Sequence, residues 1–198
     1  MKLAGLLLAA GGATRFGSPK VLANYRGEPL VRRAAQLLVN RCPAGVHVVV
    51  GASAAGVRGA LANDLAQGSV TLVDNPDWAR GLSSSLVRGV AALPASADAV
   101  LILLCDQPAI TGDDLDALIA AWQVEPALIA AAGFSDRLGP PVIIPRAFWP
   151  QLAALRGDQG ARSLLEWHAE HTTVAMPHAA LDVDTPEDLA RLEAAPAQ

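Results

Sequence analysis

Continuous apolar runs alternate along the chain with segments in which apolar residues recur at every third or fourth position. The runs predict strands covered on both faces, and they lie at residues 3–9, 46–50, 70–73, 99–104 and 127–131. The segments between them are typical of amphipathic helices. This alternation predicts an α/β fold that is three-layer α/β/α and Rossmann-like, with a mostly parallel central sheet.

Three of the predicted helices carry start signals. Pro29 stands where the first turn of a helix accepts proline, ahead of an apolar stripe over residues 30–38. Thr111 and Asp114 form a capping-box pattern, and residues 185–188 repeat that pattern before the last apolar stripe. Two further helices are predicted at residues 148–155 and 161–168.

Residues 133–144 depart from the alternation. A strand, a glycine and proline turn and a second short apolar run predict a hairpin or an excursion from the sheet. The rest of the chain shows no linker, charge run, low-complexity tract or internal repeat. We therefore expect a single domain over residues 1–198.

Composition narrows the class of protein. With 52% hydrophobic and 17% charged residues, the chain is too apolar for a disordered protein. A net charge of −4 without a basic run argues against binding to nucleic acid or to an anionic membrane. A secretory signal is the alternative interpretation of the first apolar run, but a strand also explains the Gly11-Gly12 break, so we expect a soluble cytoplasmic protein. Cys42 and Cys105 lack metal-site spacing and are predicted to be buried thiols.

The loop after the first predicted strand has the composition of a phosphate site. Gly11 and Gly12 allow the backbone N–H groups to approach an anion, while Arg15 and Lys20 add two cations. The spacing fits neither a Walker A loop nor a dinucleotide-binding fingerprint. A glycine-rich loop with solvated charges is the alternative.

Two aspartates suggest a metal. Asp106 follows the most apolar strand, at the edge where parallel sheets bind ligands, and Asp184 stands just before the last helix. Magnesium takes one or two carboxylates together with substrate phosphates, so this pair would suffice if the fold brings it together. A turn or N-cap role is the alternative for Asp184.

The segment after the third predicted strand suggests a pocket for a flat ligand. Gly81 and the serines at 83–85 open a helix, and small residues there leave room for a base near free N–H groups. Capping of the helix is the alternative role for these serines.

In these motifs the chain resembles the MobA-like NTP transferases, and among them the molybdenum cofactor cytidylyltransferase (MocA-like) branch. The resemblance covers nearly the whole chain, in the order of Leu8 to Lys20, Asn75-Pro76-Asp77-Trp78 to Ser85, Cys105-Asp106-Gln107-Pro108, Gly157-Asp158-Gln159-Gly160-Ala161-Arg162 and Asp182-Val183-Asp184-Thr185-Pro186. It implies a sheet of the nucleotide-diphospho-sugar transferase type that binds CTP or GTP with Mg²⁺. The implied reaction is nucleotidyl transfer to a phosphate of a molybdopterin-type cofactor, with a molybdenum hydroxylase apoenzyme as a possible later partner.

The resemblance also implies a role for each site residue. Base and ribose would lie against Ala10, Gly11 and Gly12, with Gly81 and Ser85 near the base. The triphosphate would be held by Arg15 and Lys20, and the metal by Asp106 and Asp184, so Arg15, Lys20 and Asp106 are the implied catalytic residues. The Ala-Ala-Gly opening at residues 9–11 is more like the cytidylyl branch than the guanylyl branch.

One departure concerns the acceptor. Members of the branch often carry Gly-His-Pro where this chain has Gly139-Pro140-Pro141. We expect acceptor contacts from residues 133–145 and the C-terminal helices. The competing functions are guanylyl transfer, transfer to a sugar phosphate and a non-catalytic cofactor carrier; an NAD(P)-dependent oxidoreductase is disfavoured because the chain has no G-x-G-x-x-G.

The remaining reactive or aromatic groups are predicted to be structural. His168 and His171 would lie on a solvated helix face, without the third ligand that a zinc site needs. The four tryptophans are predicted to pack in the core or between helices: Trp78, Trp122, Trp149 and Trp167.

Overall fold

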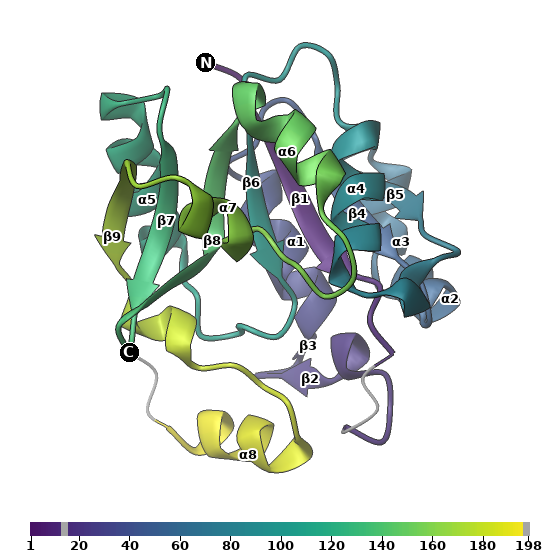
Figure 1. The fold of residues 1–198 in the computed structure, drawn as a ribbon. Helices are drawn as coiled ribbons and strands as arrows, with labels where there is room; N and C mark the ends of the chain where they lie inside the picture. Colours follow the sequence, from purple (N-terminus) through teal and green to yellow (C-terminus); the bar gives the residue numbers. More distant parts are fainter. Residues whose placement is uncertain (13–15, 196–198) are drawn as a thin grey trace.

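The computed structural model describes residues 1–12 and 16–195, and it places a seven-stranded sheet between two layers of helices (Figure 1). The strand order is β5-β4-β1-β6-β8-β7-β9. These strands are β1 (Leu3–Ala9), β4 (Val46–Val50), β5 (Val70–Asp74), β6 (Ala99–Leu104), β7 (Ile129–Phe134), β8 (Arg137–Pro145) and β9 (His171–Ala175). A separate small hairpin pairs β2 (Asn24–Tyr25) with β3 (Glu28–Pro29).

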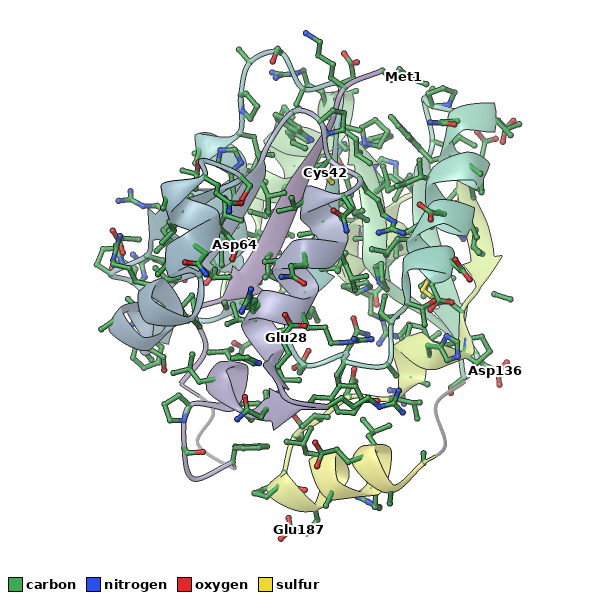
Figure 2. All side chains as sticks on the ribbon, turned by 180° about the vertical axis from the view of Figure 1, so that it is seen from behind. Met1, Glu28, Cys42, Asp64, Asp136 and Glu187 are labelled. Atoms are coloured by element: carbon green, nitrogen blue, oxygen red, sulfur yellow. The ribbon has the colours of Figure 1, made fainter. Side chains whose placement is uncertain are left out.

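Helices cover both faces of the sheet. One layer contains α1 (Leu30–Val39), α2 (Ala54–Ala60), α3 (Ala62–Ala66) and α5 (Gly112–Val124). The other contains α4 (Leu82–Ala92), α6 (Trp149–Ala154) and α7 (Arg162–Trp167). Figure 2 shows the sheet from behind, with α1 and the following Cys42 in front of it. Short 3₁₀ turns lie at η1 (Lys20–Leu22), η2 (Trp78–Arg80), η3 (Arg146–Phe148) and η4 (Pro177–Ala180).

The last helix, α8 (Pro186–Ala194), lies below the carboxyl ends of β1 and β6, beside the β2–β3 hairpin (Figure 1). The Arg26 N–H at that hairpin donates to the Glu193 carboxylate at 3.2 Å. None of the described helices is long and apolar enough to cross a membrane.

The core is divided by the sheet into two apolar layers. All seven residues of β1 are buried, and Leu6 packs against the α4 layer while Leu7 packs against the α1 layer. Complete burial of a leucine contributes about 1.5–3 kcal/mol, which is why such strands need no polar alternation. The predicted three-layer fold is confirmed.

The strand predictions are confirmed with small shifts. Strands β1, β4 and β6 begin and end as predicted, β5 extends by one residue, and the fifth predicted strand lies slightly later, at β7. The expected hairpin at residues 133–144 is formed by β7 and β8, and it turns at Ser135 and Asp136, which both have positive φ. Strand β8 is inserted antiparallel between β6 and β7.

Two helix predictions were wrong in detail. Pro29 is the N-cap of α1 rather than its first residue, because its backbone is extended and pairs with Asn24 in the small hairpin. His168 and His171 do not share a helix: α7 ends at Trp167, His168 is extended, and His171 begins β9 in register with β7. The capping boxes at Thr111 and Thr185 are both present.

The predicted buried residues are mostly buried. Cys42 and Cys105 are free thiols in the interior; burial raises the pKa of Cys42 to about 12 and also raises that of Cys105. Trp122 and Trp149 are in the core, whereas Trp167 is half exposed, so the packing prediction was wrong for that residue.

Candidate active site

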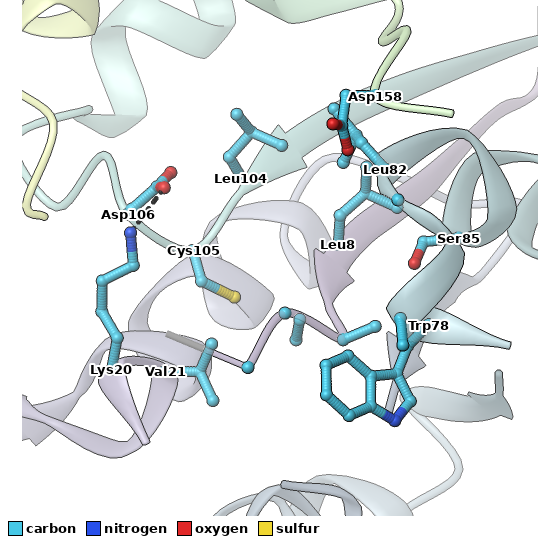
Figure 3. Close-up of a pocket in the computed structure, with 16 residues that line it drawn as sticks. Leu8, Lys20, Val21, Trp78, Leu82, Ser85, Leu104, Cys105, Asp106 and Asp158 are labelled. Carbon is cyan, nitrogen blue, oxygen red and sulfur yellow. Dashed lines mark hydrogen bonds and ion pairs between the residues drawn. The ribbon is translucent and has the colours of Figure 1, made fainter. Parts of the chain in front are cut away.

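A cavity of about 450 Å³ lies at the carboxyl ends of the parallel strands (Figure 3). Its floor is formed by the chain leaving β1, which runs from Ala10 through Gly11 to Gly12. Gly12 passes beside the Trp78 ring, and a Cβ there would lie only 2.9 Å from ring atom Cζ3. A side chain at residue 12 would therefore collide with the Trp78 ring, and glycine also leaves the backbone of this turn accessible to a ligand.

Trp78 was predicted to pack in the core or between helices, but it lines this cavity and is 36% exposed. A Cβ on Gly51 would lie 2.7 Å from the Trp78 Cβ, so two glycines from neighbouring strand ends make room for this side chain. Its ring offers a flat apolar wall, which is suited to stacking of a planar ligand.

Lys20 joins the two predicted metal ligands. Its Nζ lies 2.9 Å from Asp106 Oδ2 and 3.2 Å from Asp184 Oδ1, so residues from opposite ends of the chain meet at the rim of the cavity (Figure 3 shows the first pair). Burial alone would lower the pKa of Lys20, but the two carboxylates outweigh it and hold the pKa above its usual value. The ammonium is therefore charged throughout the neutral pH range.

The carboxylates fit a divalent cation. Asp106 Oδ1 is buried without a hydrogen-bond partner in the structure, which leaves a desolvated acceptor beside the cavity. The pKa of the neighbouring Asp182 is raised by partial burial and by the Asp106 charge, as expected where carboxylates crowd together. Within residues 1–12 and 16–195, no three His, Cys, Asp or Glu side chains are arranged as a complete metal site. Two carboxylates match a site that substrate phosphates complete.

The start of α4 forms the opposite wall. Gly81 has φ of 103° and precedes the helix, and Ser85, 5% exposed, reaches the cavity from its first turns. The serines at 84 and 85 receive hydrogen bonds from Asn75 Nδ2 at 3.0 and 3.1 Å. Asn75, itself 3% exposed, fixes these hydroxyls and was not singled out as a site residue.

The loop from Gly157 to Gly160 completes this wall. The Ser83 N–H donates to Gly157 O at 3.0 Å, and a Cβ on Gly81 would lie 2.5 Å from that oxygen. Asp158 consequently lies at the cavity beside Leu82 (Figure 3). The motif at residues 157–162 was part of the resemblance, but no site role followed from it because only the tertiary contact brings the loop to α4.

The model of the MobA-like NTP transferase domain matches residues 5–173 of this chain. The chain belongs to the MobA-like NTP transferase family. Among curated relatives, nicotine blue oxidoreductase of Paenarthrobacter nicotinovorans is 35% identical, over 95% of each chain. Molybdenum cofactor guanylyltransferase of Shewanella loihica is 26% identical, over 96% of this chain and 95% of its own.

Among solved structures, Rv0371c of Mycobacterium tuberculosis is 27% identical and superposes with a TM-score of 0.82 over 98% of each chain. The same protein has been solved with manganese, with a TM-score of 0.77 and 26% identity, again over 98% of each chain. These neighbours, together with the strand order, establish that this MobA-like chain has the nucleotidyltransferase fold of the nucleotide-diphospho-sugar transferase type.

Most of the predicted site residues of this MobA-like chain converge. The cavity is lined by Ala10, Gly11, Gly12, Lys20, Gly81, Ser85 and Asp106. Asp184 does not line the cavity, but its Oδ1 pairs with the Nζ of Lys20 at the rim. The prediction for Arg15 falls on residues 13–15, outside those that the structure describes.

Proposed function

We propose that this protein is a nucleotidyltransferase that works as one domain and moves CMP from CTP to the terminal phosphate of a molybdopterin-type cofactor. The observation that carries the proposal is the meeting of Lys20, Asp106 and Asp184 beside a glycine-lined cavity of about 450 Å³. That volume is within the range of small-molecule and nucleotide sites. The relative named as a molybdenum cofactor guanylyltransferase supports the acceptor class.

The chemistry asks mainly for positioning and charge neutralisation. An oxygen of the acceptor phosphate attacks the α-phosphorus, the bond to the bridging oxygen of the β-phosphate breaks, and pyrophosphate leaves. Lys20 neutralises the α-phosphate region as charge builds, and Arg15 is assigned to the leaving pyrophosphate. A phosphate dianion is already nucleophilic, so the site needs no general base.

A divalent cation, with Mg²⁺ expected, would be held by Asp106 and Asp184 and would act on phosphate oxygens as a Lewis acid. The buried, unpartnered Asp106 Oδ1 is the observation that supports this ligand set. Within the chain, Lys20 keeps both carboxylates near one point before substrate arrives.

The deciding experiment measures pyrophosphate release from CTP, GTP, ATP and UTP with Mg²⁺ and molybdenum cofactor. We expect CTP-selective release that requires the cofactor and is lost in Asp106→Ala. Glu125→Ala is the matched control, because Glu125 is an exposed carboxylate after α5, at the opposite edge of the sheet. GTP-selective release would instead assign guanylyl transfer. In a parallel reaction a sugar phosphate replaces the molybdenum cofactor, and release only there would assign a sugar phosphate as the acceptor.

The relative named as nicotine blue oxidoreductase favours a second candidate, oxidation or reduction of an organic substrate. We choose NAD(P)H as the electron donor with which to test it. A pocket for the phosphates of a nucleotide could also hold the pyrophosphate of a dinucleotide, although the chain lacks G-x-G-x-x-G. The same preparation therefore receives NADPH and a quinoid acceptor dye. Loss of NADPH absorbance without pyrophosphate release would replace the transferase proposal with this one.

A further inference from the structure

Gln107 follows Asp106 just beyond the end of β6, and its side chain is only 7% exposed. Its amide nitrogen Nε2 donates to Ala179 O at 2.8 Å and to Pro140 O at 3.2 Å. Because both partners are carbonyl oxygens, which only accept, the nitrogen end of the amide must face them. Pro140 also lines a second cavity, of about 320 Å³, which shares Asp158 with the nucleotide cavity, the cavity of about 450 Å³ proposed for CTP. The Gln107 amide therefore joins the end of β6 to β8 and to η4.

The interior position of this amide is unfavourable in itself. Among the residues that the structure describes, the Oε1 atom of Gln107 is buried without a hydrogen-bond partner. A buried acceptor without a partner lowers the free energy of unfolding, whereas a methionine of similar volume would carry no such cost. The two N–H donors are thus what distinguishes glutamine from an apolar residue at this position.

The hydrogen bond to Ala179 helps to determine where Asp184 lies. A second bond, from the Val183 N–H to Asp106 O at 2.8 Å, is made four residues further along the chain. The segment from Ala179 to Val183 is therefore attached at both ends to residues 106 and 107. One attachment would let this segment pivot, whereas two fix its direction, and Asp184 comes directly after it.

The rest of the fold is held independently of Gln107. His178 Nδ1, in η4, lies 2.8 Å from Asp114 Oδ2 at the start of α5, and Ala179 is fully buried. Strand β8 is held by its pairing with β6 and β7. Loss of the Gln107 hydrogen bonds should therefore loosen the segment before Asp184 without unfolding the sheet.

We infer that Gln107 is a positioning residue for the divalent cation, because it holds the segment before Asp184 close enough to Asp106 for both carboxylates to bind one ion. The inference rests on the proposed function and adds to its ligand pair a residue that touches neither substrate nor metal. Lys20 also draws the two carboxylates together, but its ammonium is assigned to the α-phosphate during transfer. The buried Gln107 amide can keep its contacts throughout that step.

The test measures how much Mn²⁺ strengthens nucleotide binding to the full chain. Calorimetry titrates CTP, or GTP if only GTP binds, into the wild type and into Gln107→Met, once with saturating Mn²⁺ and once with EDTA. Hydrogen exchange followed by NMR reports the Val183 N–H in the absence of ligands. Gln123→Met is the matched control, because it makes the same substitution at an exposed position of α5.

We expect Gln107→Met to weaken nucleotide binding with Mn²⁺ roughly tenfold or more, as for loss of a residue that orients a metal ligand. Binding in EDTA should change less than about twofold, because the nucleotide cavity itself is unaltered. The Val183 N–H should exchange faster. A merely structural role would instead weaken binding equally with Mn²⁺ and with EDTA. Should Gln107→Met fail to fold, Gln107→Asn decides by the same measurement, since it keeps the amide but withdraws it by one methylene group.

The outcomes separate this inference from the proposed function. If the folded Gln107 variant gains as much nucleotide affinity from Mn²⁺ as the wild type does, the inference is overturned and the transferase proposal stands. A wild type that binds nucleotide equally with Mn²⁺ and with EDTA overturns the metal ligand set together with this inference. Failure of the wild type to bind any nucleotide overturns the transferase proposal itself.

Discussion

The two halves of the sheet build the site in different ways. In the parallel half, β5, β4, β1 and β6 end at one edge, and the segments that follow β1, β5 and β6 line the nucleotide cavity. In the other half, β8 runs antiparallel between β6 and β7, and the contributing residues come from outside the strand ends. Asp158 precedes α7, and Asp184 precedes α8.

This difference shows when a local motif is enough to locate a site. A residue just after a parallel strand has a known position, because every such strand delivers its end to the same edge. A residue between a helix and an antiparallel strand has no such rule, so its place depends on long-range packing. The two halves meet at Lys20 and at Gly81, and substitutions there are the sharpest tests of the comparison.

The largest effect is expected for Lys20→Met. Among the described residues, Lys20 is the only lysine that pairs with both Asp106 and Asp184. Its removal leaves these two carboxylates at the phosphate site without the Lys20 charge. We expect the turnover number for pyrophosphate release to fall roughly 10²–10³-fold, as for loss of one transition-state donor. Lys2→Met, exposed at the opposite end of β1, is the control. A loss below about tenfold in a folded variant would contradict the role of Lys20 in neutralising the α-phosphate.

Gly81→Ala should give the largest loss of stability. Its φ of 103° and the Gly157 oxygen at 2.5 Å from a Cβ both oppose a side chain. We expect the free energy of unfolding to fall by about 2–3 kcal/mol in urea titrations. Gly59→Ala is the control, because a Cβ on this helical glycine would meet open space. This substitution should raise the free energy of unfolding by about 0.5–1 kcal/mol. Equal effects of the two substitutions would show that the Gly81–Gly157 contact is weak.

Removal of each capping box in turn should distinguish a core helix, α5, from a peripheral helix, α8. Thr111→Ala removes the cap of α5, which buries Leu115, Leu118 and Trp122, and should cost about 1 kcal/mol of global stability. Thr185→Ala removes the same cap from α8, which buries no residue, so the unfolding midpoint should move less. Hydrogen exchange should instead show local opening of α8. A global loss as large as that of Thr111→Ala would mean that α8 is part of the core.

The smallest effect is a titration at the start of α8. Backbone N–H groups of Thr185 and Asp184 donate to Asp188 and lower its pKa to about 2, with the Thr185 hydroxyl and Arg191 contributing. Because the folded pKa is depressed, this stabilisation is present above about pH 4 and is lost as the pH falls towards 2. Carboxyl-carbon NMR should place the Asp188 midpoint near pH 2, and Thr185→Ala should raise it. If Asp188 of the wild type titrates with an ordinary midpoint, its carboxylate does not accept the capping hydrogen bonds.

The strands of the parallel half could be predicted from local sequence patterns. Apolar runs predicted β1, β4 and β6 with their ends, and the structure joins the segments after β1 and β6 through the Lys20–Asp106 ion pair. The wrong predictions concern residues at which a local pattern and long-range packing favour different structures. His168 and His171 have helical spacing, but pairing of β9 with β7 stops the helix before them. Trp78 has the size of a core residue, yet two glycines hold it at the cavity wall.

The sequence by itself determined the alternation of strands and helices, the glycine turn after β1 and the desolvated Asp106 after β6, because each depends on neighbouring residues and on burial. Only the tertiary structure decided that Asp184 lies 3.2 Å from Lys20, that Asn75 holds Ser85, and that Asp158 lines two cavities. These contacts join residues distant along the chain, and packing of whole elements selects them from many pairings that local patterns allow equally.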